Sequence, residues 1–117
     1  MKMIKVKIRN AELEAALLNP ETAKRYDDGV AAIAEKADEA KLCGSCCEAI
    51  KIQCNAVINF IDDIFGEGSA KEAVGGETDL LTCLEAYRDI ANAYKEQVIP
   101  YLHKFQEDIG LKVSGAE

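Results

Sequence analysis

Three long segments of the chain place an apolar residue at every third or fourth position, which is the period of an amphipathic α-helix. These segments are residues 20–41, 45–65 and 78–110. Short breaks separate them, and short connections between helices favour antiparallel neighbours. The pattern therefore predicts a mainly α-helical protein, built as a small antiparallel bundle of three main helices. We expect the 117 residues to form a single domain.

Capping residues indicate where these helices begin and end. Asn19 precedes a proline and can cap the first helix. Ser45, with a glutamate three residues later, matches a capping box for the second, and we expect Thr78 to cap the last. Gly66 follows Phe65 directly, which favours a helix end at this point. We expect one further helical turn over residues 69–74.

Two residues inside the predicted helices disfavour a regular helix. Gly29 costs about 1 kcal/mol relative to alanine. Pro100 removes one backbone hydrogen bond, and its ring clashes with the preceding turn. Because the apolar period continues across Pro100, we expect a kink there and not the end of the helix.

Residues 1–10 alternate basic and apolar side chains, which is typical of a half-buried β-strand. The basic side chains are Lys2, Lys5, Lys7 and Arg9. Residues 11–18 either complete a hairpin with this strand or begin a helical turn, and the pattern leaves both alternatives open. We expect the strand to lie at the edge of the bundle or to pair with another chain.

The charge balance disfavours some classes of partner. With 21 acidic and 14 basic residues the chain has a net charge of -7, and binding to nucleic acid requires a clustered basic surface. No apolar run approaches the ~20 residues of a membrane span. The first eight residues also lack the continuous apolar region of a signal peptide. We therefore expect a cytoplasmic protein that binds neither nucleic acid nor membranes.

The five cysteines are expected to be reduced in that compartment. Cys43 and Cys46 form a C-x-x-C pair, but a structural zinc site needs four ligands and a second pair is missing. A thiol-based or metal-binding function at this pair is therefore only an alternative. Cys47, Cys54 and Cys83 occupy apolar positions, and we expect them in the core as small hydrophobic residues.

No candidate catalytic residue has the neighbours that catalysis requires. His103 is the single histidine, it lacks a recognisable triad partner, and we expect it on the surface. Asp62 and Asp63 are adjacent in a helix, so their side chains point about 100° apart and lie on a solvated face. The glycine-rich segments lack the lysine and serine of a phosphate-binding loop. We therefore predict a protein that is not an enzyme and has no catalytic residue, cofactor or metal site.

The last predicted helix has a wider apolar face than one neighbouring helix would cover. Beside its main apolar line, Cys83, Ile90 and Leu102 form a second line. Such a face often packs against another protein chain, including a second copy of the same chain. We expect a protein partner to contact Phe60, Ile64, Phe65, Leu84, Tyr87, Tyr94 and Tyr101.

One long segment has a specific sequence pattern. Residues 60–69 read FIDDIFGEGS, Gly75 and Gly76 follow, and residues 79–87 read DLLTCLEAY. The pattern resembles small proteins encoded in the tail-morphogenesis regions of phages and prophages of Gram-positive bacteria. The charged first strand and residues 24–26 (KRY) in a capped helix agree with this resemblance. Between the two glycine blocks the chain has only Lys71, where those proteins have an aromatic and a basic residue.

The resemblance implies a tail assembly chaperone or another small tail-region protein. Such a protein would bind the tail tube or tape-measure protein through apolar helix faces, without a cofactor, in the cytoplasm of the bacterial host. Two alternatives stay open. One is a phage-encoded regulator or inhibitor of a host defence protein, and the other is the thiol- or metal-binding module at Cys43 and Cys46.

Overall fold

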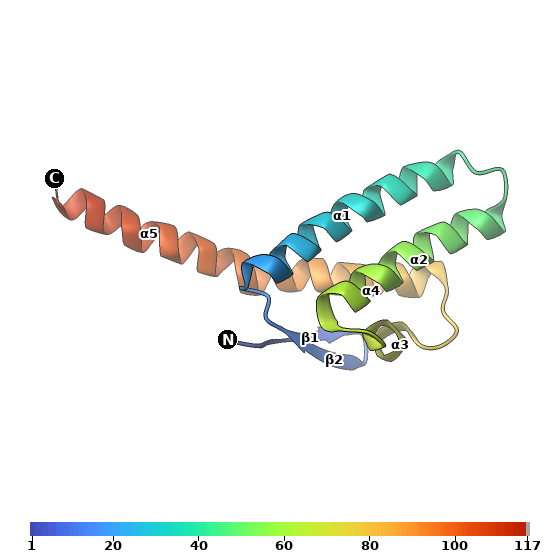
Figure 1. The fold of residues 1–117 in the computed structure, drawn as a ribbon, viewed down its shortest axis with the longest axis horizontal. Helices are drawn as coiled ribbons and strands as arrows, with labels where there is room; N and C mark the ends of the chain where they lie inside the picture. Colours follow the sequence, from blue (N-terminus) through green and yellow to red (C-terminus); the bar gives the residue numbers. More distant parts are fainter. Residues whose placement is uncertain (117) are drawn as a thin grey trace.

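The computed structural model is mainly α-helical, with a two-stranded antiparallel sheet at its N-terminus (Figure 1). It describes residues 1–116, with side chains through residue 109. This confirms the predicted fold class. The elements, in chain order, are β1 (Ile4–Ile8), β2 (Ala11–Ala15), α1 (Pro20–Lys41), α2 (Cys46–Phe65), α3 (Ser69–Val74), α4 (Leu80–Ala93), the π-helical turn η1 (Tyr94–Val98) and α5 (Ile99–Ala116).

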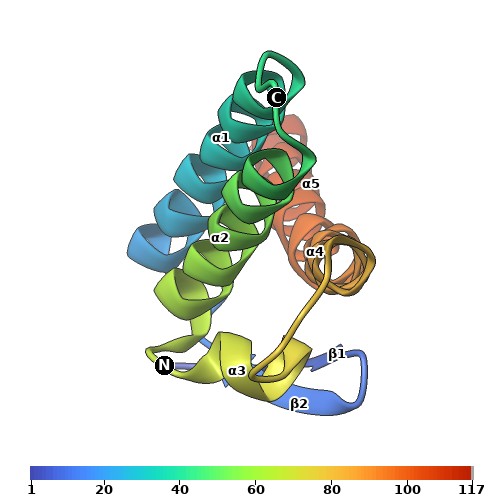
Figure 2. The same ribbon diagram turned by 90° about the vertical axis from the view of Figure 1, so that its right-hand side faces the viewer.

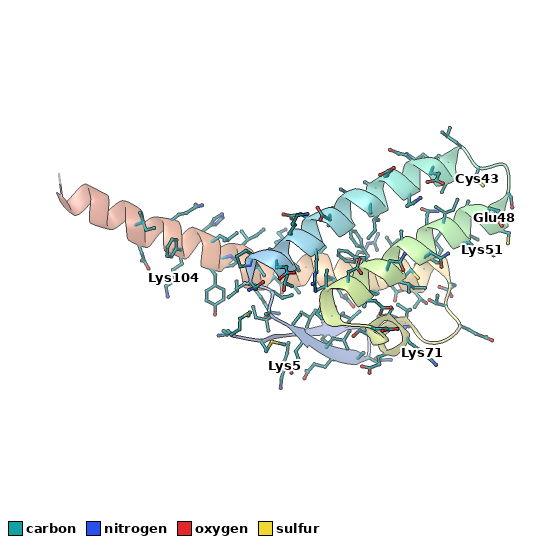
Figure 3. The ribbon with its side chains drawn as sticks, in the orientation of Figure 1. Lys5, Cys43, Glu48, Lys51, Lys71 and Lys104 are labelled. Atoms are coloured by element: carbon teal, nitrogen blue, oxygen red, sulfur yellow. The ribbon has the colours of Figure 1, made fainter. Side chains whose placement is uncertain are left out.

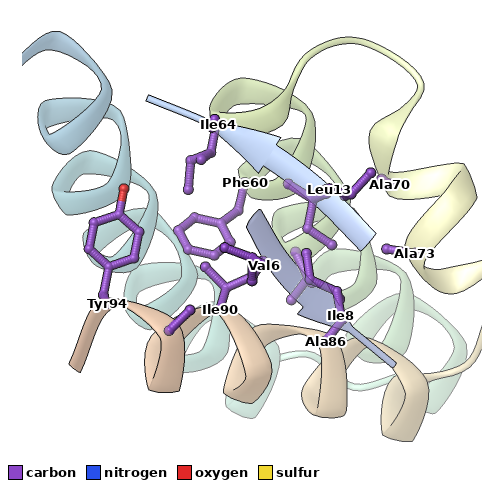
Figure 4. Packing of buried hydrophobic residues seen from close by; sticks show 14 of the residues in the cluster. Val6, Ile8, Leu13, Phe60, Ile64, Ala70, Ala73, Ala86, Ile90 and Tyr94 are labelled. Atoms are coloured by element: carbon purple, nitrogen blue, oxygen red, sulfur yellow. The ribbon is translucent and has the colours of Figure 1, made fainter. Parts of the chain in front are cut away.

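The helices α1 and α2 form an antiparallel pair, and α4 packs against α2 (Figures 1 and 2). Figure 2 shows these three helices on one side and the β-hairpin with α3 beneath them. One cluster of buried apolar residues joins the hairpin to α2, α3, α4 and η1. Phe60, Val6 and Ile90 lie close together inside it (Figure 4).

The N-terminal segment forms a complete hairpin, which settles the alternative left open for residues 11–18. β1 pairs with β2 in a register that places Ile4 opposite Ala15 and Ile8 opposite Ala11. The side chains of β1 alternate between buried and exposed, so Val6 faces the core. The basic strand β1 therefore pairs with β2 of the same chain. The alternation of apolar and basic residues determines which of its side chains face the core.

Caps begin the first two helices where they were expected. The Asn19 side chain accepts hydrogen bonds from two backbone N–H groups at the start of α1, and Ser45 accepts one from Glu48 at 3.2 Å. The cap of α4 is Asp79 and not Thr78, so that prediction was wrong by one residue. Asp79 accepts the N–H of Thr82 at 2.7 Å, and this bond lowers the pKa of its carboxyl.

The last helical run passes through Pro100 without a break. Its disturbance is the π turn η1, in which Ile99 N–H donates to the carbonyl of Tyr94. In a regular α-helix the ring of Pro100 would clash with the carbonyl four residues earlier. The π turn η1, which is wider than an α-helical turn, lies directly before Pro100. The helix predicted over residues 78–110 is therefore α4, η1 and α5 in succession.

The helix α5 extends away from the rest of the molecule (Figure 1). The molecule measures 62 × 30 × 20 Å along its principal axes, and α5 forms one end of the long axis. All side chains of residues 101–109 are exposed. Within the part of the chain that the structure describes, every helix is too short or too polar to cross a membrane.

Candidate protein-binding surface

The exposed part of α5 carries large apolar side chains at the spacing of a buried helix face. Leu102 is 54% exposed, Phe105 66% and Ile109 47%. We call these three residues the α5 stripe. Tyr101, 46% exposed, lies beside the stripe, and the Lys2 ammonium lies 5.7 Å from its ring centre. A contiguous apolar patch of this kind is typical of a protein-binding site.

A groove of about 490 Å³ lies at the base of the stripe, between α1 and the last helical run. Ala23 and Tyr26 of α1 form one wall, and Tyr94, Val98 and Leu102 form the other. Leu102 belongs to both the groove and the stripe, so the two make one continuous apolar surface. Asp27 and Lys95 also line this groove and provide charged groups next to it.

Two stacked tyrosines form part of the groove. The ring centres of Tyr26 and Tyr94 are 3.6 Å apart, and the planes differ by 18°. Tyr94 belongs to the π turn and points toward α1 (Figure 4). Its hydroxyl is buried and has no hydrogen-bond partner among the described residues. Burial raises the pKa of both hydroxyls.

A second, smaller hollow of about 170 Å³ lies among α1, α2 and α4. Leu84 and Tyr87, two of the predicted partner-binding residues, line it together with Ile33 and Val57. Leu84 is 39% exposed and Tyr87 is half-buried. This hollow is separate from the groove at α5, because no residue lines both.

The structure divides the predicted partner-binding residues into three groups. Phe60, Ile64 and Tyr94 are buried in the core, with exposed fractions of 2%, 6% and 5%. Phe65 is half-buried like Tyr87, and Tyr101 is exposed like Leu84. Phe60 and Ile64 line neither the groove nor the stripe, so we leave them out of the candidate interface. Tyr94 is retained only because its ring forms part of the groove wall.

The sequence prediction named Tyr101 and Leu102 near the end of the last helix but not Phe105 and Ile109, although a signal for these two was present. α1 has 22 residues and α2 has 20, whereas the last helical run spans residues 80–116. A helix so much longer than its neighbours must extend beyond them. Apolar residues that continue past that point, such as Phe105 and Ile109, are therefore the ones without a neighbour.

The second apolar line of the last helix is mostly core. The burial of Cys83 agrees with the prediction made for the cysteines, whereas the burial of Ile90 contradicts the expected contact with another chain. Cys83 and Ile90 have an exposed fraction of 0%. They belong to the face of α4 that packs against α2 and β1, which also carries Ala86 and Ala93. Only Leu102, beyond the π turn, is exposed as expected.

The cysteines are free thiols. Cys54 and Cys83 are buried, as predicted, and burial raises the pKa of Cys54 to about 11, with a hydrogen bond to Cys83 adding to it. The prediction for Cys47 was wrong: it is exposed, because it lies in the first turn of α2, outside the core cluster.

The C-x-x-C pair lies at the turn between α1 and α2. Figure 3 shows Cys43 at the opposite end of the molecule from Lys104 of α5. Cys43 is half-buried and Cys46 is exposed. Among the described residues, the structure brings together no group of three or more His, Cys, Asp or Glu side chains that could hold a metal ion.

The polar residues singled out from the sequence have ordinary surroundings. His103 is exposed on α5 and Asp63 is exposed on α2. Asp62 is half-buried, and its Oδ1 accepts the backbone N–H of Ala70 at 2.8 Å. Asp62 thus provides a side-chain cap for α3, because the N-cap residue Gly68 makes no side-chain hydrogen bond of its own. The prediction placed Asp62 on a solvated face and did not include this cap.

Comparison with known proteins gives a family. No curated protein and no solved structure matches the chain. Residues 9–108, from the hairpin turn into α5, match a family of unknown function (DUF6673). Because this match covers most of the chain, the protein belongs to the DUF6673 family.

Proposed function

We propose that the protein is a non-enzymatic binding factor that covers an apolar segment of another protein. The observation that carries the proposal is the α5 stripe, whose side chains have the spacing of a helix interface but are about half to two-thirds exposed. Because Phe105 is two-thirds exposed, the folded protein loses about two-thirds of the stabilisation that full burial of a phenylalanine gives, or about 1–2 kcal/mol.

The shape and chemistry of the surface favour a helical segment as the bound element. An amphipathic helix binds in an apolar groove through side chains one turn apart. The groove and the stripe together form such a surface, with Tyr26 and Leu102 along it and Asp27 and Lys95 beside it. Aromatic residues at the centre and charged residues at the rim are typical of protein interfaces.

The resemblance to phage tail-region proteins supports a more specific role. We propose that the partner is the tail tube or tape-measure protein of a phage, and that the factor keeps an apolar segment of it covered during assembly in the bacterial cytoplasm. Several residues of the resembling segment have structural functions here: Asp62 caps α3, and Gly66 and Gly68 have φ angles of 110° and 88°. We infer that the shared pattern accompanies the fold, and we propose that the partner-binding residues lie elsewhere, on α5.

The experiment is co-expression with the tail-tube and tape-measure proteins encoded in the same tail gene region, followed by co-purification. We expect one of them to bind the wild-type chain, and Phe105→Glu to abolish binding, because a charge at the centre of an apolar contact loses its hydration. His103→Glu is the matched control, since it adds an acid to an exposed position of α5 outside the stripe.

The outcome that contradicts the proposal is failure of both tail proteins to bind the wild-type chain. Equal binding by Phe105→Glu and the wild type would retain the function and exclude α5 as its site. Circular dichroism of Phe105→Glu checks that the body of the protein stays folded.

A further inference from the structure

We propose that Cys54 and Cys83 form an oxidation site, at which hydrogen peroxide converts two thiols of the core into a disulfide that links α2 to α4. The site is separate from the α5 stripe, and its chemistry is independent of the proposed function. It also differs from the C-x-x-C pair, whose two cysteines lie at the turn between α1 and α2.

The packing of α2 on α4 places the two thiols side by side. The two helices run in the same direction (Figure 1), and the ring centres of Phe60 and Tyr87 lie 5.6 Å apart between them. At 1.5 Å per residue, Cys54 precedes Phe60 by about 9 Å along α2. Cys83 precedes Tyr87 by about 6 Å along α4. The two cysteines therefore lie at nearly the same level of the helix pair, and their thiols form a hydrogen bond.

Short side chains at this contact favour the close approach that a disulfide needs. Cys54 and Val57 are buried on α2, and Cys83 and Ala86 are buried on α4. Both cysteines belong to the core cluster, with exposed fractions of 7% and 0%. A disulfide requires Cα atoms about 4.4–6.8 Å apart, and only short side chains allow two helices to pack so closely.

The hollow among α1, α2 and α4 gives a small oxidant access to one of the two thiols. Cys83 lines this hollow of about 170 Å³, and Cys54 does not. Hydrogen peroxide is uncharged, and the hollow is several times larger than the roughly 30 Å³ that a water molecule occupies in the liquid. Because the exposed fraction of Cys83 is 0%, a bulky oxidant such as glutathione disulfide cannot reach its sulfur in the folded protein.

The reaction has two steps, one at each thiol. In the first, the Cys83 thiolate attacks one oxygen of the peroxide. An S–O bond forms, the O–O bond breaks, and the hydroxide that leaves takes up the thiol proton to become water. In the second, Cys54 attacks the Cys83 sulfur. The S–S bond forms, the S–O bond breaks, and the hydroxyl group leaves with the Cys54 proton as a second water molecule. The two thiols thus lose two protons and two electrons to the peroxide.

The surroundings of the two sulfurs support this order of attack. Burial and the hydrogen bond with Cys83 raise the pKa of Cys54 to about 11, so Cys54 stays protonated near neutral pH. A thiol is a much weaker nucleophile than a thiolate. On the other side of the pair, the hydroxyl of Thr78 lies 3.6 Å from Sγ of Cys83 and can donate to its thiolate.

The first experiment is peptide mapping after oxidation of the folded protein. Cys43, Cys46 and Cys47 are replaced by serine, because these thiols are exposed or half-buried. The protein is treated with hydrogen peroxide, free thiols are alkylated, and trypsin separates Cys54, in residues 52–71, from Cys83, in residues 72–88. We expect the two peptides joined by a disulfide, which dithiothreitol separates. Glutathione disulfide at the same concentration should leave both thiols free.

The second experiment tests the order of attack in the same background. In Cys54→Ala the oxidised Cys83 has no thiol to pair with, so dimedone should capture it as the sulfenic acid. In Cys83→Ala the remaining Cys54 should stay unmodified. Circular dichroism of both variants confirms that they are folded.

The third measurement is the melting temperature of the oxidised protein. The disulfide closes a loop that contains α3 and both glycine-rich segments, and a cross-link of this kind restricts the unfolded chain. We expect the melting temperature to rise by roughly 5–15 °C and to return to its starting value after dithiothreitol.

Four outcomes would overturn the inference. Two thiols that stay free while peroxide oxidises glutathione in the same solution exclude the site. Sulfinic acid without joined peptides means that the sulfurs are too far apart to pair. A disulfide that forms equally fast with glutathione disulfide, or only in urea, arises in the unfolded chain and not through the hollow. Capture of Cys54 by dimedone in Cys83→Ala contradicts the first attack by Cys83.

Discussion

Gly29 lies in α1 where the helix packs directly on the buried ring of Phe60. A Cβ atom at this position would clash with Cδ1 of that ring. Helix propensity alone predicts that Gly29→Ala stabilises the protein by about 1 kcal/mol. We expect the opposite, a loss of about 1–3 kcal/mol in the free energy of unfolding, because overpacking moves a core side chain.

Urea denaturation of Gly29→Ala measures this loss. Gly44→Ala is the matched control, since a Cβ there would meet no atom within 4 Å, and its effect should be close to zero. A Gly29→Ala variant as stable as the wild type would contradict the close packing of α1 on Phe60.

The buried hydroxyl of Tyr94 predicts a second effect at the scale of one residue. Burial raises the pKa of Tyr94, and the neighbouring Tyr26 adds to the shift. Above about pH 10 the unfolded chain releases this proton while the folded chain keeps it, so stability falls as the pH rises. Tyr94→Phe removes an unpaired buried hydroxyl, so the variant should be more stable than the wild type by about 1 kcal/mol at neutral pH. It also removes the fall in stability that ionisation of this hydroxyl causes at high pH.

The measurement is the free energy of unfolding of Tyr94→Phe and the wild type from about pH 8 to about pH 11. The advantage of the variant should grow with pH. Tyr101→Phe is the control, because Tyr101 is 46% exposed and its replacement shows the effect of removing a tyrosine hydroxyl that is not buried. An advantage of Tyr94→Phe that shrinks toward high pH would show that the hydroxyl is not held neutral in the folded state.

At the scale of elements, the hairpin is attached to α4 by its turn. Arg9 has a left-handed φ of 57°, and its N–H donates to Oδ2 of Asp89 at 2.8 Å. Its side chain also lies 3.6 Å from Glu85. We expect Asp89→Ala to lower the free energy of unfolding by about 1–2 kcal/mol, because the N–H loses a charged acceptor.

Two further variants separate the sources of this loss in the same urea experiment. Asp89→Asn keeps an oxygen acceptor and should lose less than Asp89→Ala. Glu85→Gln should have an effect close to zero, because exposed ion pairs contribute little. Equal losses for Asp89→Ala and Asp89→Asn would mean that the charge of Asp89, and not its hydrogen bond, holds the turn.

The sequence predicted these elements best where the signal is local. The beginnings of α1 and α2 follow from Asn19 and Ser45, whose side chains cap the next residues, and β1 follows from alternation. The inner face of α4 was not predictable in this way. The helix α4 carries two lines of apolar residues with the helical period. Only the packing of α4 against the hairpin and α2 determines that the line with Cys83 and Ile90 faces the core.

The candidate site was only partly predictable for a related reason. An aromatic residue at helical spacing can face the core, as Phe60 and Tyr94 do, or solvent, as Phe105 does. The sequence contains no local feature that separates the two. The difference comes from the relative lengths of the helices and from the π turn before Pro100, which are properties of the assembled fold.

At the scale of the whole molecule, the protein consists of a packed body and a projecting helix. All described side chains after Ile99 are exposed, and Leu102 is the one among them that also lines the groove. The body contains the entire cluster of buried residues, which ends at Val98. The two parts should therefore be separable, because α5 contributes little buried apolar surface to the body.

A chain truncated after Leu102 tests this separation. We expect it to remain folded, with a free energy of unfolding within about 1 kcal/mol of the wild type, since surface changes have effects of this size. It should also lose binding of a tail protein, because Phe105 and Ile109 are absent. Circular dichroism with urea denaturation measures the first effect, and co-purification measures the second. An unfolded truncated chain would mean that α5 stabilises the body, and the exposed stripe would then be part of the fold and not a surface kept for a partner.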